Sequence, residues 1–87
     1  MEYTIIEKRD ISLRGGPRRK TIKVRLYREQ VSSVELHRIA DHLNAQLRPA
    51  WEEITIWFYT PSVPSEGAAR ACLVYDSNGI ILAKSYV

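Results

Sequence analysis

Two segments of the chain alternate strictly between two kinds of side chain, and this pattern limits the fold more than any other feature of the sequence. In residues 21–27 aliphatic side chains alternate with polar ones, and in residues 53–60 they alternate with threonine and aromatic ones. A β-strand places successive side chains on opposite faces of a sheet, so each segment predicts a strand with one face in a core. The side chains expected in the core are Ile22, Val24, Leu26, Ile54, Ile56 and Phe58.

One amphipathic helix is predicted between these two strands. Ser32 followed by Glu35 forms a capping box, which marks a helix start, and good helix formers continue to Arg48 before Pro49. At about 100° per residue, the apolar side chains collect in one stripe along the helix. That stripe consists of Leu36, Ile39, Ala40, Leu43 and Leu47. Because only one side of the helix is apolar, we expect it to cover one face of a sheet.

Three further strands are expected outside this unit. Residues 3–13 predict a first strand, and the paired glycines of residues 14–18 predict the turn that follows it. Residues 68–75 predict a strand whose small alanines suit close approach by a helix. Residues 80–87 predict the last strand, after the turn sequence Asp76-Ser77-Asn78-Gly79.

The register of this last hairpin stays open. A two-residue turn at Asn78 and Gly79 pairs Tyr75 with Leu82. A three-residue loop that ends in Gly79 instead pairs Val74 with Leu82. Because strand side chains alternate, the second register reverses the faces of the last strand.

Together these elements predict a single small α+β domain over residues 1–87. One helix packs on one face of a mainly antiparallel sheet of about five strands, in the order β-β-α-β-β-β. A single helix cannot cover both faces of such a sheet, so the second face is expected to meet water, a partner or another copy of the chain. The side chains expected on that face include Lys23, Arg25, Tyr27, Trp57 and Tyr59.

Basic residues are concentrated in the first third of the chain. The whole chain has 13 Lys and Arg and 10 Asp and Glu, a net charge of +3. Residues 8–28 hold nine of the basic residues and one acidic residue, Asp10, so this segment carries +8 and the remainder −5. The partition favours either electrostatic pairing between chains or contact with phosphate groups.

The single cysteine, Cys72, limits the class of protein. One cysteine forms no intramolecular disulfide and supplies too few ligands for a structural zinc site, so a reducing compartment is expected. The first residues lack a basic segment followed by a long apolar run, and no apolar stretch approaches the roughly 20 residues that span a bilayer. We therefore expect a soluble cytoplasmic protein with no membrane partner.

Two short motifs lie in the second half of the chain. One is the strand end Phe58-Tyr59-Thr60-Pro61, and the other is the run of small residues Gly67-Ala68-Ala69-Arg70-Ala71. Together with the alternating basic strand and the helix, over residues 20–75, they resemble a small bacterial domain family of unknown function. The resemblance implies the β-β-α-β-β-β pattern and a bacterial source, and it implies no activity and no site residues.

Residue patterns for acid-base catalysis or metal binding are incomplete. His37 and Asp41 share a helix flank at metal-ligand spacing, but two ligands do not define a site and His42 points about 100° further round. Glu52 and Glu53 are neighbours that point to opposite faces of a strand, so they cannot act together as acid and base. We expect no bound metal.

The remaining motifs also have simpler interpretations. Cys72 lies in an apolar strand, where a thiol is an inert small hydrophobe. Gly15 and Gly16 are not followed by the Lys-Ser or Lys-Thr step of a phosphate loop. Pro61 and Pro64 are explained by a rigid loop rather than by docking on an aromatic groove. We therefore expect no enzyme, no catalytic residue and no cofactor.

Two surfaces remain as candidates for function. The leading hypothesis is a non-enzymatic interaction module that forms a homodimer or docks a protein partner through the open sheet face. Its interface residues are Trp57, Tyr59, Tyr27, Arg25 and Lys23. The alternative is nucleic-acid binding through the basic hairpin at residues 14–28, by charge and by base stacking on Trp57 and Tyr59. Its contact residues are Arg14, Arg18, Arg19, Lys20 and Arg28.

Overall fold

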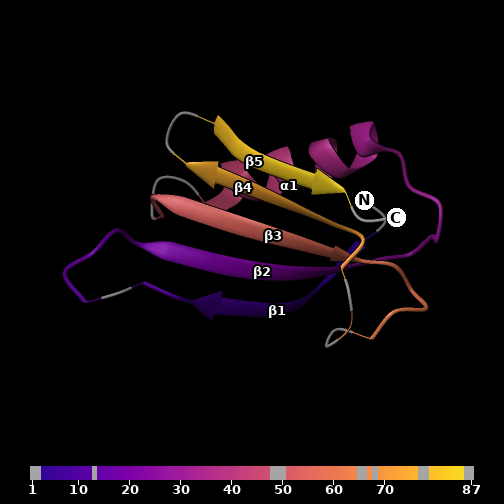
Figure 1. The fold of residues 1–87 in the computed structure, drawn as a ribbon, viewed down its shortest axis with the longest axis horizontal. Coiled ribbons are helices and arrows are strands. Elements are labelled where there is room, and N and C mark those ends of the chain that lie inside the picture. Colours follow the sequence, from indigo (N-terminus) through magenta and orange to yellow (C-terminus); the bar gives the residue numbers. More distant parts are fainter. Residues whose placement is uncertain are drawn as a thin grey trace.

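A computed structural model describes residues 3–12, 14–47, 51–64, 67, 69–76 and 79–85 of the chain. This part contains one helix and a mixed sheet, which confirms the expected α+β class (Figure 1). The elements are β1 (Tyr3–Asp10), β2 (Arg19–Leu26), α1 (Ser33–Leu47), β3 (Glu53–Tyr59), β4 (Ala71–Asp76) and β5 (Gly79–Ser85). The strands lie side by side in their sequence order, β1-β2-β3-β4-β5.

The pairing of β2 with β3 is parallel, so the sheet is mixed, and the antiparallel character that we expected holds for its other three pairs. α1 connects these two strands and brings the chain back to the end of the sheet where β2 began, so β3 runs in the same direction. The pairs β1 with β2, β3 with β4, and β4 with β5 are antiparallel. In Figure 1, α1 lies behind the sheet, against one face.

The core lies between α1 and this face of the sheet. The aliphatic residues expected from the alternation of β2 and β3 are all buried, and most of them have no exposed surface. β4 adds Ala71, Leu73 and Tyr75 to the same cluster. Ala40 is also fully buried (0 %), which lets the α1 backbone approach the sheet closely. The apolar stripe of α1 contributes Leu36, Ile39, Ala40 and Leu43 to the cluster.

The start of α1 follows the capping pattern in the sequence. The Glu35 backbone N–H donates to Ser32 Oγ at 3.2 Å, and the Leu36 N–H donates to the Ser32 carbonyl at 3.1 Å. The Glu35 carboxylate forms an ion pair with the Arg28 guanidinium. This contact joins the start of the loop after β2 to the first turn of α1. The expected end of the helix at Arg48 lies outside the described residues.

The first strand ends earlier than the sequence predicts, so the turn that follows it also begins earlier. β1 ends at Asp10 rather than at residue 13, because the Ser12 N–H donates to Asp10 Oδ1 at 2.9 Å and turns the chain. The following turn includes Gly15 at a φ of 78°, a conformation that glycine adopts at little cost. β1 also contains a bulge between Ile5 and Glu7. Leu13 lies outside the described residues.

The last hairpin adopts the second of the two open registers over most of its length. Val74 pairs with Leu82, and the register shifts between Val74 and Tyr75. Beyond the shift, Tyr75 pairs with Ile80 and Asp76 pairs with Gly79. One extra residue in β5 therefore produces the register that the longer loop predicts. Ser77 and Asn78 lie outside the described residues.

Candidate functional site

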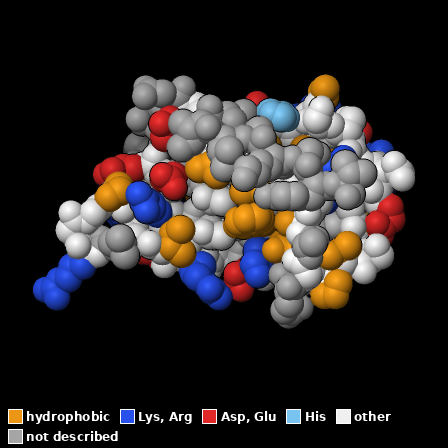
Figure 2. Space-filling model, in the orientation of Figure 1, with side chains coloured by type: hydrophobic (Ala, Val, Ile, Leu, Met, Phe, Trp, Pro, Cys, Tyr) orange, Lys and Arg blue, Asp and Glu red, His pale blue; other side chains and the backbone are white. Residues whose placement is uncertain are grey.

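The face of the sheet opposite α1 is the larger candidate surface. Register places Thr21, Lys23 and Arg25 of β2 on it, beside Thr55, Trp57 and Tyr59 of β3 and Cys72 and Val74 of β4. Figure 2 shows this face, with hydrophobic side chains gathered near its middle and Lys and Arg side chains beside them. We call it the open face. The positions expected from the sequence for Lys23, Arg25, Trp57 and Tyr59 are confirmed.

Trp57 lies at the centre of the open face. It belongs to β3, the middle strand of the sheet, and pairs with Lys23 on one side and with Cys72 on the other. Its side chain is half-buried, while Cys72 beside it is 3 % exposed. Trp57 is therefore an aromatic side chain in the middle of the sheet, and the rest of the chain covers this side chain only in part.

Tyr59, by contrast, is only 5 % exposed. Beside it, Arg25 Nη1 donates to the Thr60 carbonyl at 2.8 Å and also to the Val63 carbonyl. These bonds hold the loop that follows β3 against the end of the open face. Arg25 and Tyr59, both predicted to contact a partner, are thus occupied within the chain.

Glu29 holds the same loop through a second contact. The Ser62 N–H donates to Glu29 Oε1 at 2.8 Å, and hydrogen bonding with Ser62 lowers the pKa of Glu29. The loop itself consists of turns, since the Val63 N–H donates to the Thr60 carbonyl at 3.2 Å. A turn at this position differs from the extended polyproline helix that binds aromatic grooves.

Lys23 and Tyr27 remain on the rim of the open face. Lys23 Nζ lies 3.8 Å from Glu7 Oε2 and 5.8 Å from the centroid of the Tyr59 ring. Tyr27 is 59 % exposed, and its hydroxyl shares a hydrogen bond with Thr4 Oγ1. Both side chains therefore have polar contacts within the chain and keep part of their surface in water.

The basic hairpin is divided between the two faces of the sheet. Arg19 lies on the side of the open face, where its Nε is 3.8 Å from Glu53 Oε2. Arg18 Cζ and Lys20 Nζ lie 4.9 and 4.8 Å from the centroid of the Trp51 ring, on the side of α1. Strand alternation causes this division, because neighbours in the sequence point to opposite faces. The ten candidate residues thus do not form one surface.

Trp51 is a site residue that sequence reasoning did not select. Because β2 and β3 are parallel, the chain just before β3 lies beside the start of β2, and the Glu52 and Glu53 N–H groups donate to the Arg18 carbonyl at 2.9 and 3.1 Å. Trp51 also packs against the core cluster. If the parallel pairing of β2 and β3 had been predicted from the connecting helix, Trp51 would have been predicted to lie beside the basic residues.

The other two basic candidates lie far apart. Arg14 is exposed in the loop between β1 and β2, which extends past the other strands in Figure 1. Arg28 follows the opposite end of β2 and pairs with Glu35. Arg14 therefore shares the hairpin end of the sheet with Arg18 and Lys20, whereas Arg28 does not.

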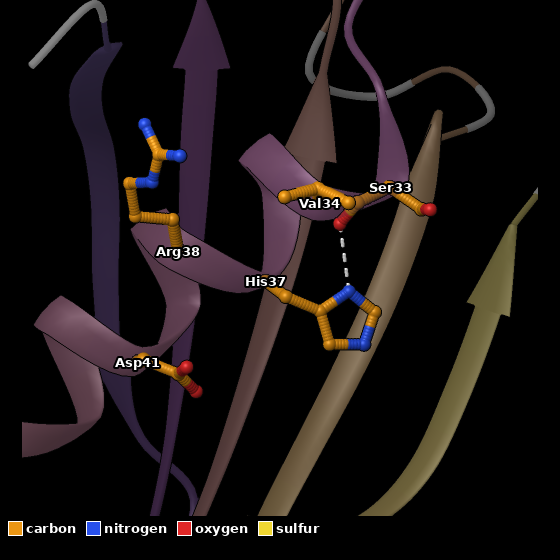
Figure 3. Close-up of a pocket in the computed structure, with 5 residues that line it drawn as sticks. All are labelled: Ser33, Val34, His37, Arg38 and Asp41. Atoms are coloured by element: carbon orange, nitrogen blue, oxygen red, sulfur yellow. Dashed lines mark hydrogen bonds between the residues drawn. The ribbon is translucent and has the colours of Figure 1, made fainter.

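A shallow groove runs along the outer flank of α1, and Figure 3 shows its lining. His37 bonds through Nδ1 to the Ser33 carbonyl at 2.7 Å, and Asp41 accepts a hydrogen bond from the Tyr75 hydroxyl at 2.7 Å. Both polar side chains are thus engaged in local contacts. In the described part of the chain, no three His, Cys, Asp or Glu side chains gather as metal ligands would, and no helix has the length and apolar character needed to cross a bilayer.

Comparison of the chain with protein-family models, curated proteins and solved structures finds no match. The resemblance to a small bacterial domain family, based on residues 58–61 and 67–71, stays a prediction. Two geometric features remain as the basis for function. They are the half-buried Trp57 on the open face and the basic side chains around Trp51 at the hairpin end.

Proposed function

We propose that this chain is a non-enzymatic interaction module that forms a homodimer through the open face around Trp57. The observation that carries the proposal is the position of Trp57 in the middle strand, half-buried, on the face that α1 does not cover. Tryptophan is enriched among the residues that dominate binding energy, and such residues cluster near the centre of an interface. Tyr59 and Arg25 support this surface from within the chain.

The charges of the open face favour a second copy as the partner. Arg19 and Lys23 of β2 are each paired within the chain with a carboxylate of a flanking strand, Glu53 of β3 and Glu7 of β1, and these pairs are partly exposed. A two-fold axis brings the same surface of both copies together. In such a dimer, Arg19 and Lys23 of one copy can exchange these partners for the same carboxylates of the other copy. Both signs of charge on one face therefore make it complementary to itself.

The same proposal includes a cytoplasmic setting and a bacterial source. Cys72 is the single cysteine of the chain and is buried, which suits a reducing compartment. The expectation that the chain is not an enzyme also belongs to this proposal. It rests on the local hydrogen bonds that occupy His37 and Asp41, the most suggestive of the titratable pairs in the sequence.

Sedimentation velocity over about 1 to 200 µM protein tests the proposal. We expect wild-type chain to convert from monomer to dimer across this range. Trp57→Ala should weaken the dimer about 30-fold, the equivalent of a binding-energy loss of roughly 2 kcal/mol. Thr55→Arg, which adds a charged side chain to the open face without touching the core, should have a similar effect.

The matched control is Val34→Ala. Val34 is 67 % exposed on α1, away from the open face, so its truncation removes exposed apolar surface without affecting the proposed contact. Thermal melts of all the variants separate loss of association from loss of folding. A wild-type chain that remains monomeric throughout the range would overturn the proposal, as would equal weakening by Val34→Ala and Trp57→Ala.

A further inference from the structure

The loop between β1 and β2 projects from the sheet and is held by hydrogen bonds at its base. At its base the Ile11 N–H donates to the Arg19 carbonyl at 3.0 Å, and the Arg19 N–H donates to Ser12 Oγ at 2.7 Å. The Ser12 N–H is held by the carboxylate of Asp10. In Figure 1 this loop extends beyond the ends of the other strands. The hairpin therefore presents its side chains at a defined place outside the body of the sheet.

Basic side chains surround this projection. Lys8, Arg9, Arg14 and Arg18 are exposed, and Lys20 is partly exposed. The nearby carboxylates are Asp10, Glu7, which lies 3.5 Å from Arg9, Glu53, which lies 3.8 Å from Arg19, and Glu52, whose N–H donates to the Arg18 carbonyl. Hydrogen bonding by Ser12 lowers the pKa of Asp10, and the charges of Arg18 and Lys20 lower it further. Among the described residues, six cations including Arg19 thus face four carboxylates, and Asp10 is bonded to the backbone of the turn.

Trp51 fixes two of these cations side by side. Arg18 and Lys20 are two residues apart on one face at the start of β2, which spaces their backbones by about 6.6 Å. Both cationic groups lie within 5 Å of the Trp51 ring centroid, and Trp51 packs against the core. Cation–π contacts of this kind restrain long side chains that otherwise move freely. The result is a preorganised row of positive charge, extended by Arg14 at the tip.

A row of cations suits a linear polyanion better than a single small anion. Arginine dominates the hairpin, and its planar guanidinium binds phosphate oxygens in pairs. Duplex DNA carries phosphates along both edges of its grooves, and its major groove admits a two-stranded β-ribbon. β2 pairs with β3 from Arg19 onward, so the part of the β1–β2 hairpin that projects is the loop 11–18, and the contact expected there is with the phosphate backbone.

The structure disfavours base stacking, the single-stranded mode of binding. Trp57 lies on the opposite face of the sheet from Arg18 and Lys20, and Tyr59 is buried. Trp51 lies beside the row, but two cations of its own chain already occupy its ring. Among the residues that the structure describes, no open aromatic platform lies next to the cations, so contact with the phosphate backbone of a duplex is the favoured mode.

We infer that the β1–β2 hairpin binds the phosphate backbone of duplex nucleic acid through Arg14, Arg18 and Lys20. Lys8 and Arg9 add to the local potential. Arg19 and Arg28 make no contact, since Arg19 faces Glu53 and Arg28 lies at the other end of β2 beside Glu35. This site uses a different surface from Trp57 and does not rest on self-association.

Fluorescence anisotropy with a labelled duplex DNA of about 20 base pairs tests the inference. Three phosphate contacts predict a slope of about −2.7 for log affinity against log salt, which is about 40-fold weaker binding at 200 mM than at 50 mM. Arg14→Gln removes one contact, so it should reduce the slope by about 0.9 and weaken binding about tenfold at 50 mM salt. Arg18→Gln and Lys20→Gln should act in the same direction.

Arg38→Gln is the matched control, because it removes one exposed charge from α1, away from the hairpin. We expect it to leave the affinity and the slope unchanged. Equal losses for Arg38→Gln and Arg14→Gln would overturn the inference, as would absence of duplex binding at 50 mM salt. Tighter binding of the matching single strand would also overturn it, and so would binding of phosphatidylserine vesicles without binding of the duplex.

Discussion

Tyr75 donates its phenolic hydrogen to Asp41 Oδ1 across 2.7 Å, which ties the end of β4 to the outer flank of α1. The tyrosine ring belongs to the apolar core and is 2 % exposed. Burial, and then the hydrogen bond and charge of Asp41, raise the pKa of Tyr75. One hydroxyl thus adds a directional link to the apolar packing between helix and sheet.

Tyr75→Phe should lower the free energy of unfolding by about 1 kcal/mol at pH 7, because it removes this hydrogen bond and leaves the ring in place. Asp41 is exposed, so water can satisfy its carboxylate in the variant. Urea denaturation measures the loss. Asp41→Asn keeps an acceptor at the same position and should cost less, whereas an unchanged unfolding energy in Tyr75→Phe would show that the link contributes nothing.

The raised pKa of Tyr75 also predicts a dependence of stability on alkaline pH. In the unfolded chain Tyr75 loses its proton near pH 10.0, while in the folded chain it holds that proton to higher pH. The stabilisation is therefore fully present below pH 10 and is lost as the pH rises above it. Comparison of unfolding energies for wild type and Tyr75→Phe isolates this effect, and their difference should shrink above about pH 10. A constant difference would contradict the assignment.

Arg25→Gln should release the loop after β3. The guanidinium of Arg25 bonds the carbonyls of Thr60 and Val63, and hydrogen bonds of a charged group contribute about 1.5 to 3 kcal/mol. We expect a loss of about 2 kcal/mol in unfolding energy and faster hydrogen exchange at the Val63 amide. Exchange at Val63 that matches wild type would mean that the loop is held by other contacts.

Ala40→Leu should destabilise the chain by about 1 to 3 kcal/mol, because Ala40 is fully buried where α1 meets the sheet and a larger side chain overpacks that contact. Ala45→Leu provides the control, since Ala45 is exposed on the same helix and leucine is also a good helix former. Thermal and urea unfolding compare the two. If Ala40→Leu and Ala45→Leu have similar unfolding energies, the helix and the sheet do not approach closely at Ala40.

Cys72 should react slowly with a thiol reagent in the folded chain and rapidly in urea. It lies on the open face, yet it is 3 % exposed. The folded structure therefore protects the thiol, and its rate of modification reports on local opening of β4. Rapid modification under native conditions would show that this part of the open face is accessible.

The core and the position of the helix were predictable because they depend on local patterns. The alternation of β2 and β3 and the capping box at Ser32 each involve neighbouring residues, and a period of two or 3.6 assigns the faces. The direction of β3 relative to β2 was not recognised, although a helix that connects adjacent strands favours a parallel pair. Because this direction was not predicted, the contact of Trp51 with Arg18 and Lys20 was missed as well.

The candidate sites were predicted less well than the fold, since they depend on contacts between distant segments. Alternation placed Tyr59 and Arg25 on the open face, but it did not show that Arg25 reaches the Val63 carbonyl 38 positions away. The basic residues of segment 8–28 were interpreted as one surface because they lie close together in the sequence. Strand geometry sends Arg19 and Lys20 to opposite faces, so only the hairpin end remains a coherent basic site.

The most direct test of self-association follows the indole N–H signals of Trp51 and Trp57 by NMR during dilution. The two tryptophans lie on different faces of the sheet, so each reports on one surface. Between about 500 and 10 µM protein, we expect the Trp57 signal to shift with concentration and the Trp51 signal to stay in place. A Trp57 signal that remains fixed across the whole dilution would contradict a dimer built on the open face.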